Sequence, residues 1–244
     1  MIFPILLIAA GATAIIALAF TDDDGPVPNY LPDLPPMSGS TRYKKVDAIL
    51  GELKKASETS GIPLGLLVGW VAKESGGRLS EVPKPLKGEP DGERGYFQLT
   101  PSESRSLGLD HKRLSEDPIY SINAGLLLIG RYMKAVDALG VAVPGSMYYW
   151  LLVKLAHTMG SGAMKIIVNG AKAAGAARTW DALERHALDN EARYFSATKH
   201  SPSKWFPLVD KVREVGQPFG FGDRDVVVGG EVFRDIVDPL DCLT

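Results

Sequence analysis

Apolar residues recur at intervals of three and four through most of the chain between residues 41 and 200, and this spacing favours an all-α fold. One such stripe contains four residues, Val46, Ile49, Leu50 and Leu53. A helix places residues at this spacing on one face, where they can be buried together against a neighbour. The sequence therefore predicts a core that is almost entirely helical.

Capping signals show where several of these helices begin. Thr100-Pro101 is followed by Glu103, which is a capping-box pattern with proline at the first helical position. Asp117-Pro118 repeats the combination of a capping residue and a proline. Further helices are expected over residues 146–159, 162–174 and 180–197.

Composition limits the partners of the 244-residue chain. With 45% hydrophobic and 23% charged residues, it can bury one core of ordinary domain size. The formal net charge of −2 provides no broad basic field, so nucleic acid is not expected as a partner. Four histidines and one cysteine, without clustered ligand spacings, predict no metal site, and we expect no cofactor.

The two ends differ from the middle of the chain. Residues 1–20 are uncharged and almost wholly apolar, long enough to cross a bilayer as a hydrophobic helix. They are either a retained membrane anchor or a signal segment, and the absence of a preceding Lys or Arg favours the anchor. Residues 21–40 are rich in Asp and Pro and are expected to be an extended linker.

We therefore expect one helical domain over residues 41–200, followed by a small C-terminal extension over residues 201–244. Within the extension, β-branched residues on both sides of Gly229-Gly230 predict a small hairpin.

One carboxylate occupies a position that should be apolar. Leu67, Trp70, Val71 and Glu74 fall on one helix face, so Glu74 continues an apolar stripe. The following Gly76 supplies a stop signal, which places Glu74 in the last turn of its helix.

This location predicts a raised pKa for Glu74. The negative end of the helix dipole and burial beside Trp70 both disfavour a carboxylate, and a general acid needs such an environment. The alternative is a surface glutamate that pairs with Arg78, four residues further along the helix.

Four motifs, in order along about residues 45–195, resemble those of the soluble lytic transglycosylases. They are Glu74-Ser75-Gly76-Gly77, Gly95-Tyr96-Phe97-Gln98-Leu99-Thr100-Pro101, Asp117-Pro118 with Ser121-Ile122 and Ala124-Gly125, and Ala156-His157-Thr158-Met159-Gly160-Ser161-Gly162. Each motif alone is weak, but four in order are specific. The resemblance implies a single helical domain of the α+β lysozyme-like superfamily with a groove for peptidoglycan.

The resemblance also implies a reaction. Glu74 would protonate the glycosidic oxygen between N-acetylmuramic acid and N-acetylglucosamine, while the acetamido group of the substrate stabilises the cationic centre. The Glu74 carboxylate would then take the proton of the muramoyl C6 hydroxyl, which closes a 1,6-anhydro ring. No enzyme nucleophile is required.

The glycine-bounded motif suggests contacts with the glycan. Gly95 permits close approach of the backbone to a sugar, Tyr96 offers a ring for stacking, and Gln98 offers an amide for hydroxyl or acetamido groups. Tyr96 and Phe97 could instead be core residues. Ser75 could bond Glu74 or the acetamido group, or equally a helix carbonyl.

His157 departs from the family pattern, in which many relatives carry Tyr at this position. A histidine there could still bond Glu74 or the substrate, and it would titrate near neutrality and make activity more sensitive to pH. The alternative is a partly buried structural histidine.

Two other functions remain open. Goose-type lysozymes share this fold, and Asp91 could act with Glu74 by orienting a water, which would make the chain a muramidase. Asp91, Glu89 and Glu93 could equally form a solvated acidic loop. The chain could also be a membrane-tethered module that binds or assembles on peptidoglycan without cleaving it.

The setting follows from residues 1–20. We expect a protein that is anchored in a membrane and faces the cell wall, or one carried in a bacteriophage virion that opens the wall during genome entry. Virion or envelope proteins would then be partners in addition to glycan strands.

Overall fold

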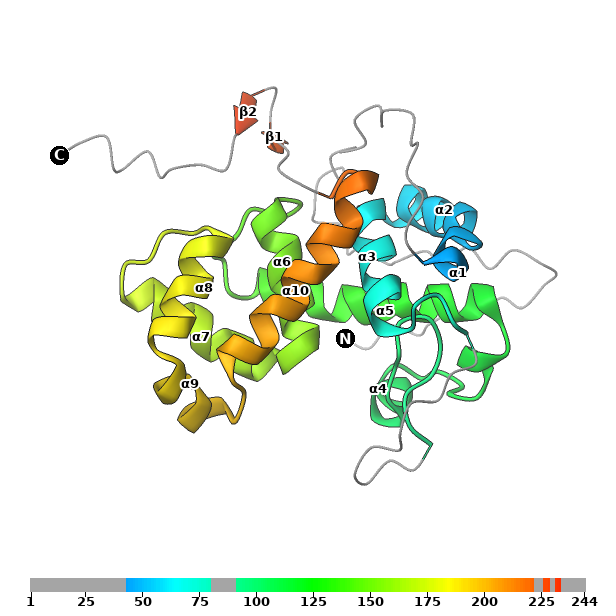
Figure 1. Cartoon of the computed structure of the whole chain (residues 1–244), viewed down its shortest axis with the longest axis horizontal. Helices are drawn as coiled ribbons and strands as arrows, with labels where there is room; N and C mark the ends of the chain where they lie inside the picture. The colour runs from blue at the N-terminus through cyan, green and yellow to red at the C-terminus, as the bar shows by residue number, and fades with distance from the viewer. Residues whose placement is uncertain (1–42, 80–90, 222–225, 229–230, 234–244) are drawn as a thin grey trace, which may run out of the picture. The chain divides into compact units, whose positions relative to one another are not determined.

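Helices form nearly all of the regular secondary structure in the computed structural model, which describes residues 43–79, 91–221, 226–228 and 231–233 (Figure 1). In chain order the elements are α1 (Lys44–Asp47), α2 (Leu50–Ser60), α3 (Leu64–Glu74), α4 (Pro101–Ser106), η1 (Arg113–Ser115), α5 (Pro118–Asp137), α6 (Met147–Met159), α7 (Ser161–Ala173), α8 (Trp180–Asp189), α9 (Glu191–Thr198), α10 (Pro202–Gly216), η2 (Gln217–Phe219), β1 (Val226–Val228) and β2 (Glu231–Phe233). The predicted all-α character is confirmed. The predicted anchor and linker, residues 1–40, lie outside the described residues.

The predicted helix starts are confirmed in detail. At α4, the Thr100 hydroxyl accepts a hydrogen bond from the Glu103 backbone N–H at 3.1 Å, and the Glu103 carboxylate accepts one from the Thr100 N–H at 2.9 Å. At α5, the Asp117 carboxylate accepts a bond from the Tyr120 N–H at 2.9 Å. Each side chain satisfies a backbone donor that the first helical turn leaves without a partner.

The single helix expected over residues 180–197 is wrong, because the chain forms α8 and α9 with a break at Asn190. Asn190 leaves the helical conformation with φ −113° and ψ 24°, and its side-chain amide donates to the His186 carbonyl at 2.9 Å. An asparagine side chain that bonds the backbone competes with helix continuation. The apolar periodicity of the two helices does not reveal this local competition.

Helix α3 lies against α10, α2, α1 and η2, and every residue from Leu64 to Ala72 is buried. Glycines allow the closest of these contacts. A Cβ on Gly65 would lie 2.4 Å from the Gly216 carbonyl oxygen, so the backbones of α3 and α10 touch there. This contact fixes the helix that ends at Glu74.

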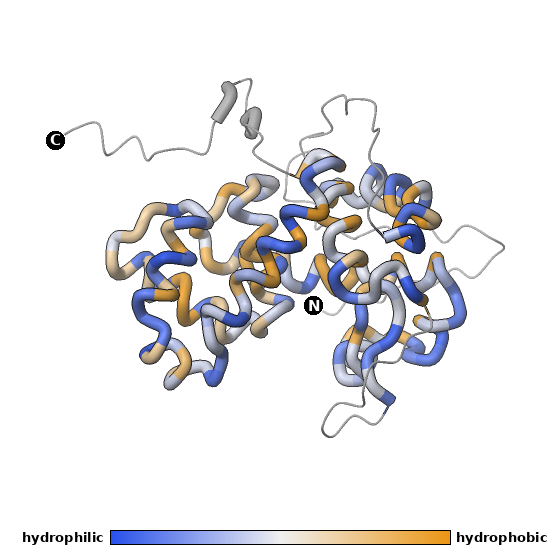
Figure 2. Tube along the Cα trace, in the orientation of Figure 1, coloured by the Kyte–Doolittle hydropathy of each residue, from blue (hydrophilic) through white to orange (hydrophobic). Residues whose placement is uncertain are grey.

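Helix α10 belongs to a segment that the sequence assigned to the C-terminal extension, and it contributes Phe206, Val209 and Val212 to the core. The Trp180 indole N–H donates to the Asp210 carboxylate at 2.8 Å, which ties α8 to α10. In Figure 2, hydrophobic and hydrophilic positions alternate along α10, as expected for a helix with one buried face.

Helix α6 is the second central helix, with every residue from Tyr148 to Ala156 buried, and it packs against α5, α7 and α10. One residue in this apolar run is charged, Lys154, and its side chain is only 3% exposed. A buried lysine requires a partner.

The predicted hairpin is confirmed as two antiparallel strands, β1 and β2, with Val227 opposite Val232. Among the helices that the structure describes, none has the length and apolar character to cross a membrane.

Candidate active site

Glu74 is the last residue of α3, as predicted, and Gly76 and Gly77 follow it with φ of 62° and 78°. These left-handed conformations suit glycine and end the helix. Leu67, Trp70 and Val71 are fully buried, while the Glu74 side chain retains 24% exposure. The carboxylate therefore stands where an apolar stripe reaches solvent.

Lys154 of α6 is the ion-pair partner of Glu74, with its Nζ atom 2.5 Å from Glu74 Oε1. The same ammonium lies 4.6 Å from the centre of the Trp70 ring, within range of a cation–π contact. The two charges come from positions 80 residues apart in the chain. Arg78, the partner considered from sequence, donates from Nε to the Ser75 carbonyl at 3.1 Å.

His157 lies one turn after Lys154 on the same face of α6. Its Nδ1 atom is 3.0 Å from Lys154 Nζ and 3.7 Å from Glu74 Oε1. An ammonium can only donate, so His157 Nδ1 accepts and the proton of the neutral ring is on Nε2. The imidazole packs against Trp70 at 4.9 Å and edge-on against Tyr132 at 5.6 Å between ring centres.

The expected rise in the pKa of Glu74 is wrong. Burial alone raises this pKa, but Lys154 lowers it through charge and a hydrogen bond, with further lowering by His157 and Lys73, and the balance is below the ordinary value. Glu74 is therefore a carboxylate near neutral pH. Burial acts in the expected direction, but the cation on α6, together with His157 and Lys73, outweighs it.

The expectation that His157 titrates near neutrality is also wrong. Burial, the positive charge of Lys154 and that of Arg131 lower the pKa of His157 to about 3, against an opposing effect of Glu74. The ring is neutral throughout the physiological range. It acts on its neighbours as a hydrogen-bond acceptor and an aromatic surface.

The turn after Arg94 is held by protein contacts. Arg94 and Leu99 form an isolated antiparallel bridge, and the Tyr96 N–H donates to the Ser121 hydroxyl at 2.8 Å. Gly95 has φ 78°, and a Cβ there would lie 2.5 Å from the Ser121 hydroxyl oxygen. The close approach that requires glycine at this position is therefore to α5.

Tyr96 and Phe97 are 4% and 0% exposed, so both rings are part of the core. Phe97 packs on Gly125 of α5, where an added Cβ would lie 2.1 Å from the ring, and its centre is 6.2 Å from that of Trp70. The Tyr96 ring is consequently not an open surface for sugar stacking in this conformation.

Gln98 and Ser75 both bond to the backbone. Gln98 has φ 51°, a left-handed conformation uncommon for a residue with a side chain, and its amide donates to the Gly95 carbonyl at 2.7 Å. The Ser75 hydroxyl donates to the Val71 carbonyl at 3.2 Å and accepts from the Gly77 N–H at 3.2 Å. Of the roles considered for Ser75, the bond to a helix carbonyl is the one observed.

Glu74, His157 and the turn from Gly95 to Gln98 are brought into one assembly through Trp70 and Phe97. Asp91 is exposed and, within the described residues, makes no hydrogen bond or ion pair with Glu74, Lys154 or His157. Glu89 lies outside the described residues. The described part of the chain contains no group of three or more His, Cys, Asp or Glu side chains able to hold a metal ion.

Lys154 is the site residue that sequence reasoning missed. The sequence does mark it, because Lys154 is the one charged residue in the apolar run from Tyr148 to Ala156 and lies three residues before His157. A lone charge on a buried helix indicates an opposite charge elsewhere in the core.

No protein-family model matches the chain, and no curated protein matches its sequence. The assignment of function therefore rests on the motifs and on the geometry around Glu74.

Proposed function

We propose that this protein is a peptidoglycan lytic transglycosylase that cleaves the β-1,4 bond between N-acetylmuramic acid and N-acetylglucosamine, with Glu74 as its acid and base. The observation that carries the proposal is the position of Glu74, a carboxylate with 24% of its side chain exposed at the end of a buried helix. Residues of two other motif-like segments lie near it: His157 Nδ1 is 3.7 Å from Glu74 Oε1, and Phe97 lies with its ring centre 6.2 Å from that of Trp70, one turn before Glu74 on α3. A lysozyme-like arrangement of the helices is part of the proposal.

The ionised state of Glu74 suits the second half of the reaction. A carboxylate can take the proton from the muramoyl C6 hydroxyl as that oxygen attacks C1, so the product ends in a 1,6-anhydro ring. The neighbouring ammonium also offsets the charge that Glu74 carries in the protein without substrate. The first half needs Glu74 to hold a proton, and the lowered pKa makes the source of that proton the central mechanistic question.

A muramidase mechanism would need a second carboxylate to orient water, about 6.5–9.5 Å from the first in inverting enzymes. Asp91 remains the candidate for that role. A wall-binding module would need no ionisable group at the Glu74 position, and a buried lysine paired with Glu74 is a costly feature for such a module.

Product analysis tests the proposal. Peptidoglycan is digested with the wild-type protein and with Glu74→Gln, and the released ends are identified by mass spectrometry. Glu58→Gln is the matched control, because Glu58 is 51% exposed on α2 and pairs only loosely with Lys54 at 4.0 Å. Anhydromuramoyl ends that disappear in Glu74→Gln and persist in Glu58→Gln are expected, whereas no release from any wall would favour a binding module.

The proposed setting is a membrane or a virion, through residues 1–20. Antibody labelling of infected or uninfected cells and of purified particles would locate the protein. Label on particles supports a role in genome entry, and label confined to the host envelope rejects it.

A further inference from the structure

An ionised Glu74 cannot protonate a glycosidic oxygen, so a proton must reach it after the glycan binds. This inference rests on the proposed function. Solvent is the usual source for an exposed acid, but a glycan seated over Glu74 would cover the 24% of its side chain that is exposed. The proton is then more readily obtained from a neighbouring side chain.

Lys154 is the proton donor in contact with Glu74. Its Nζ is 2.5 Å from Glu74 Oε1, shorter than the usual length of about 2.7–2.9 Å for a charge-assisted N–H···O bond. The bonded proton can therefore move from nitrogen to oxygen while the heavy atoms stay in place. The bond engages Oε1, and the second carboxylate oxygen of Glu74 lies outside it.

The Lys154 side chain is almost fully enclosed by protein. The side chain is 3% exposed, and its ammonium also lies 3.0 Å from His157 Nδ1 and 4.6 Å from the centre of the Trp70 ring. Burial of two opposite charges is costly even when they are paired, and a neutral acid beside a neutral amine avoids that cost. A glycan that covers the site would remove the remaining hydration of the pair, which favours the neutral form.

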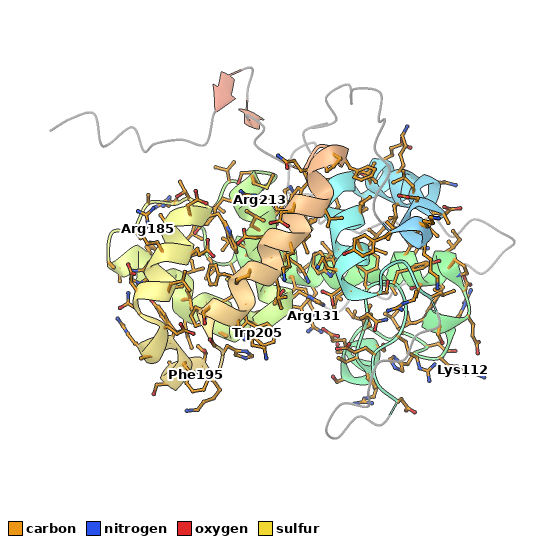
Figure 3. The ribbon with its side chains drawn as sticks, in the orientation of Figure 1. Lys112, Arg131, Arg185, Phe195, Trp205 and Arg213 are labelled. Atoms are coloured by element: carbon orange, nitrogen blue, oxygen red, sulfur yellow. The ribbon has the colours of Figure 1, made fainter. Side chains whose placement is uncertain are left out.

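The other ionisable groups near Lys154 and Glu74 do not take up the proton that these two residues share. Glu74 is also influenced by His157 and Lys73, and His157 by Arg131 of α5, which is labelled in Figure 3. His157 does not compete for the proton, because burial and Lys154 lower its pKa to about 3. Its Nδ1 instead accepts from the ammonium and orients it.

We propose that Lys154 is a positioning residue that holds the proton which Glu74 delivers to the glycosidic oxygen. On substrate binding, the proton moves from Lys154 Nζ to Glu74 Oε1, giving a neutral amine and a neutral acid. Glu74 then protonates the leaving oxygen as the C1–O4 bond breaks. The resulting carboxylate takes the proton of the C6 hydroxyl as the C1–O6 bond forms, and that proton returns to Lys154. The pair ends with the single proton it began with.

Two substitutions distinguish storage of a proton by Lys154 from the effect of its positive charge alone. Lys154→Arg keeps the positive charge and can donate a hydrogen bond, but a guanidinium does not release its proton in proteins. We expect at least about a 100-fold loss of cleavage between pH 5 and 8, the lower range for loss of acid–base catalysis. Lys154→Met removes both charge and proton. Cleavage by Lys154→Met should fall by a similar factor at pH 7. It should recover at least about tenfold at pH 5, where Glu74 can be protonated from solvent.

Lys73→Met is the matched control. Lys73 precedes Glu74 on α3 and acts on it through charge. Its removal takes away only the smallest of the charge effects on the Glu74 pKa and keeps the bond to Lys154. Cleavage should therefore stay within about threefold of wild type, with at most a small shift of the pH profile to higher pH.

A titration followed by ¹³C NMR gives a readout independent of activity and of any ligand. The Glu74 carboxyl signal is assigned by its loss in Glu74→Gln. In Lys154→Met its midpoint should move to higher pH, since burial remains and the ammonium is gone. In Lys154→Arg it should stay low, which shows that the arginine fits and still pairs with Glu74.

The outcomes are distinct. Cleavage that survives in Glu74→Gln overturns both the proposed function and this inference. Cleavage abolished in Glu74→Gln but within threefold of wild type in Lys154→Arg overturns the inference alone. An unchanged Glu74 midpoint in Lys154→Met also overturns it, because the two groups would then not share a proton.

Discussion

Gly69 of α3 lies directly against the carbonyl of Val212 in α10, and a Cβ on Gly69 would be 2.2 Å from that oxygen. The contact joins the helix that carries Glu74 to a helix beyond residue 200. Backbone atoms cannot yield as the end of a flexible side chain can, so α3 and α10 would have to separate to admit a methyl group.

Gly69→Ala should therefore lower the free energy of unfolding by about 1–3 kcal/mol or more, as expected for overpacking in a core. Gly130→Ala is the control, because Gly130 in α5 has no atom within 4 Å of an added Cβ. That substitution should be neutral or stabilising by up to about 1 kcal/mol, through helix propensity. Urea unfolding of both variants checks the prediction, and equal effects would contradict the close contact.

A chain that ends at residue 200 should not fold. It lacks α10, and with it Phe206, Val209 and Val212, which are fully buried. A chain that ends at residue 221 retains them and should unfold at the same temperature as the complete protein, within a few degrees. Circular dichroism during heating distinguishes the two. A cooperative transition in the shorter chain would show that α10 is dispensable for the core.

Stability should fall as the pH is lowered through the window between the unfolded and folded pKa values of His157. The folded pKa is about 3 and the ordinary value is 6.5, so between these limits the unfolded chain binds a proton that the folded protein does not. The contribution of the neutral His157 ring to the free energy of unfolding is therefore fully present above about pH 6.5 and is lost progressively below it.

His157→Gln removes the group that takes up a proton on unfolding, and it keeps a side chain able to accept a hydrogen bond. Its free energy of unfolding should depend less on pH between 6.5 and 4 than that of the wild type. Urea unfolding at several pH values measures both slopes. Parallel curves would mean that His157 is accessible to protons in the folded state, contrary to the lowered pKa. Glu74 contributes in the same direction at lower pH, since its folded pKa is also lowered.

Helices were predictable from sequence wherever spacing and capping agreed. The apolar stripe placed Glu74 at the end of α3, and the Thr100 and Asp117 signals located two helix starts. These features depend on neighbours within a few residues. The break at Asn190 was missed because a side-chain bond to the backbone there overrides the periodic pattern.

The electrostatics of the site could not be obtained in the same way. The pKa of Glu74 is decided by Lys154, which the chain brings near only through the packing of separate helices. Burial and the helix end depend on residues near Glu74 in the sequence, whereas the cation is 80 residues away in the chain. Likewise, Tyr96 and Phe97 share a motif that suggests sugar contacts, while tertiary packing places both rings in the core.

Cleavage in water enriched in ¹⁸O tests the central claim most directly, because a transglycosylase closes the anhydro ring with the C6 oxygen of the substrate. We expect mass spectra of the released muramoyl ends to show no incorporated ¹⁸O and the mass of the anhydro form, with all release lost in Glu74→Gln. One ¹⁸O at each new reducing end would contradict the account, since water would then be the attacking group and the protein would be a muramidase.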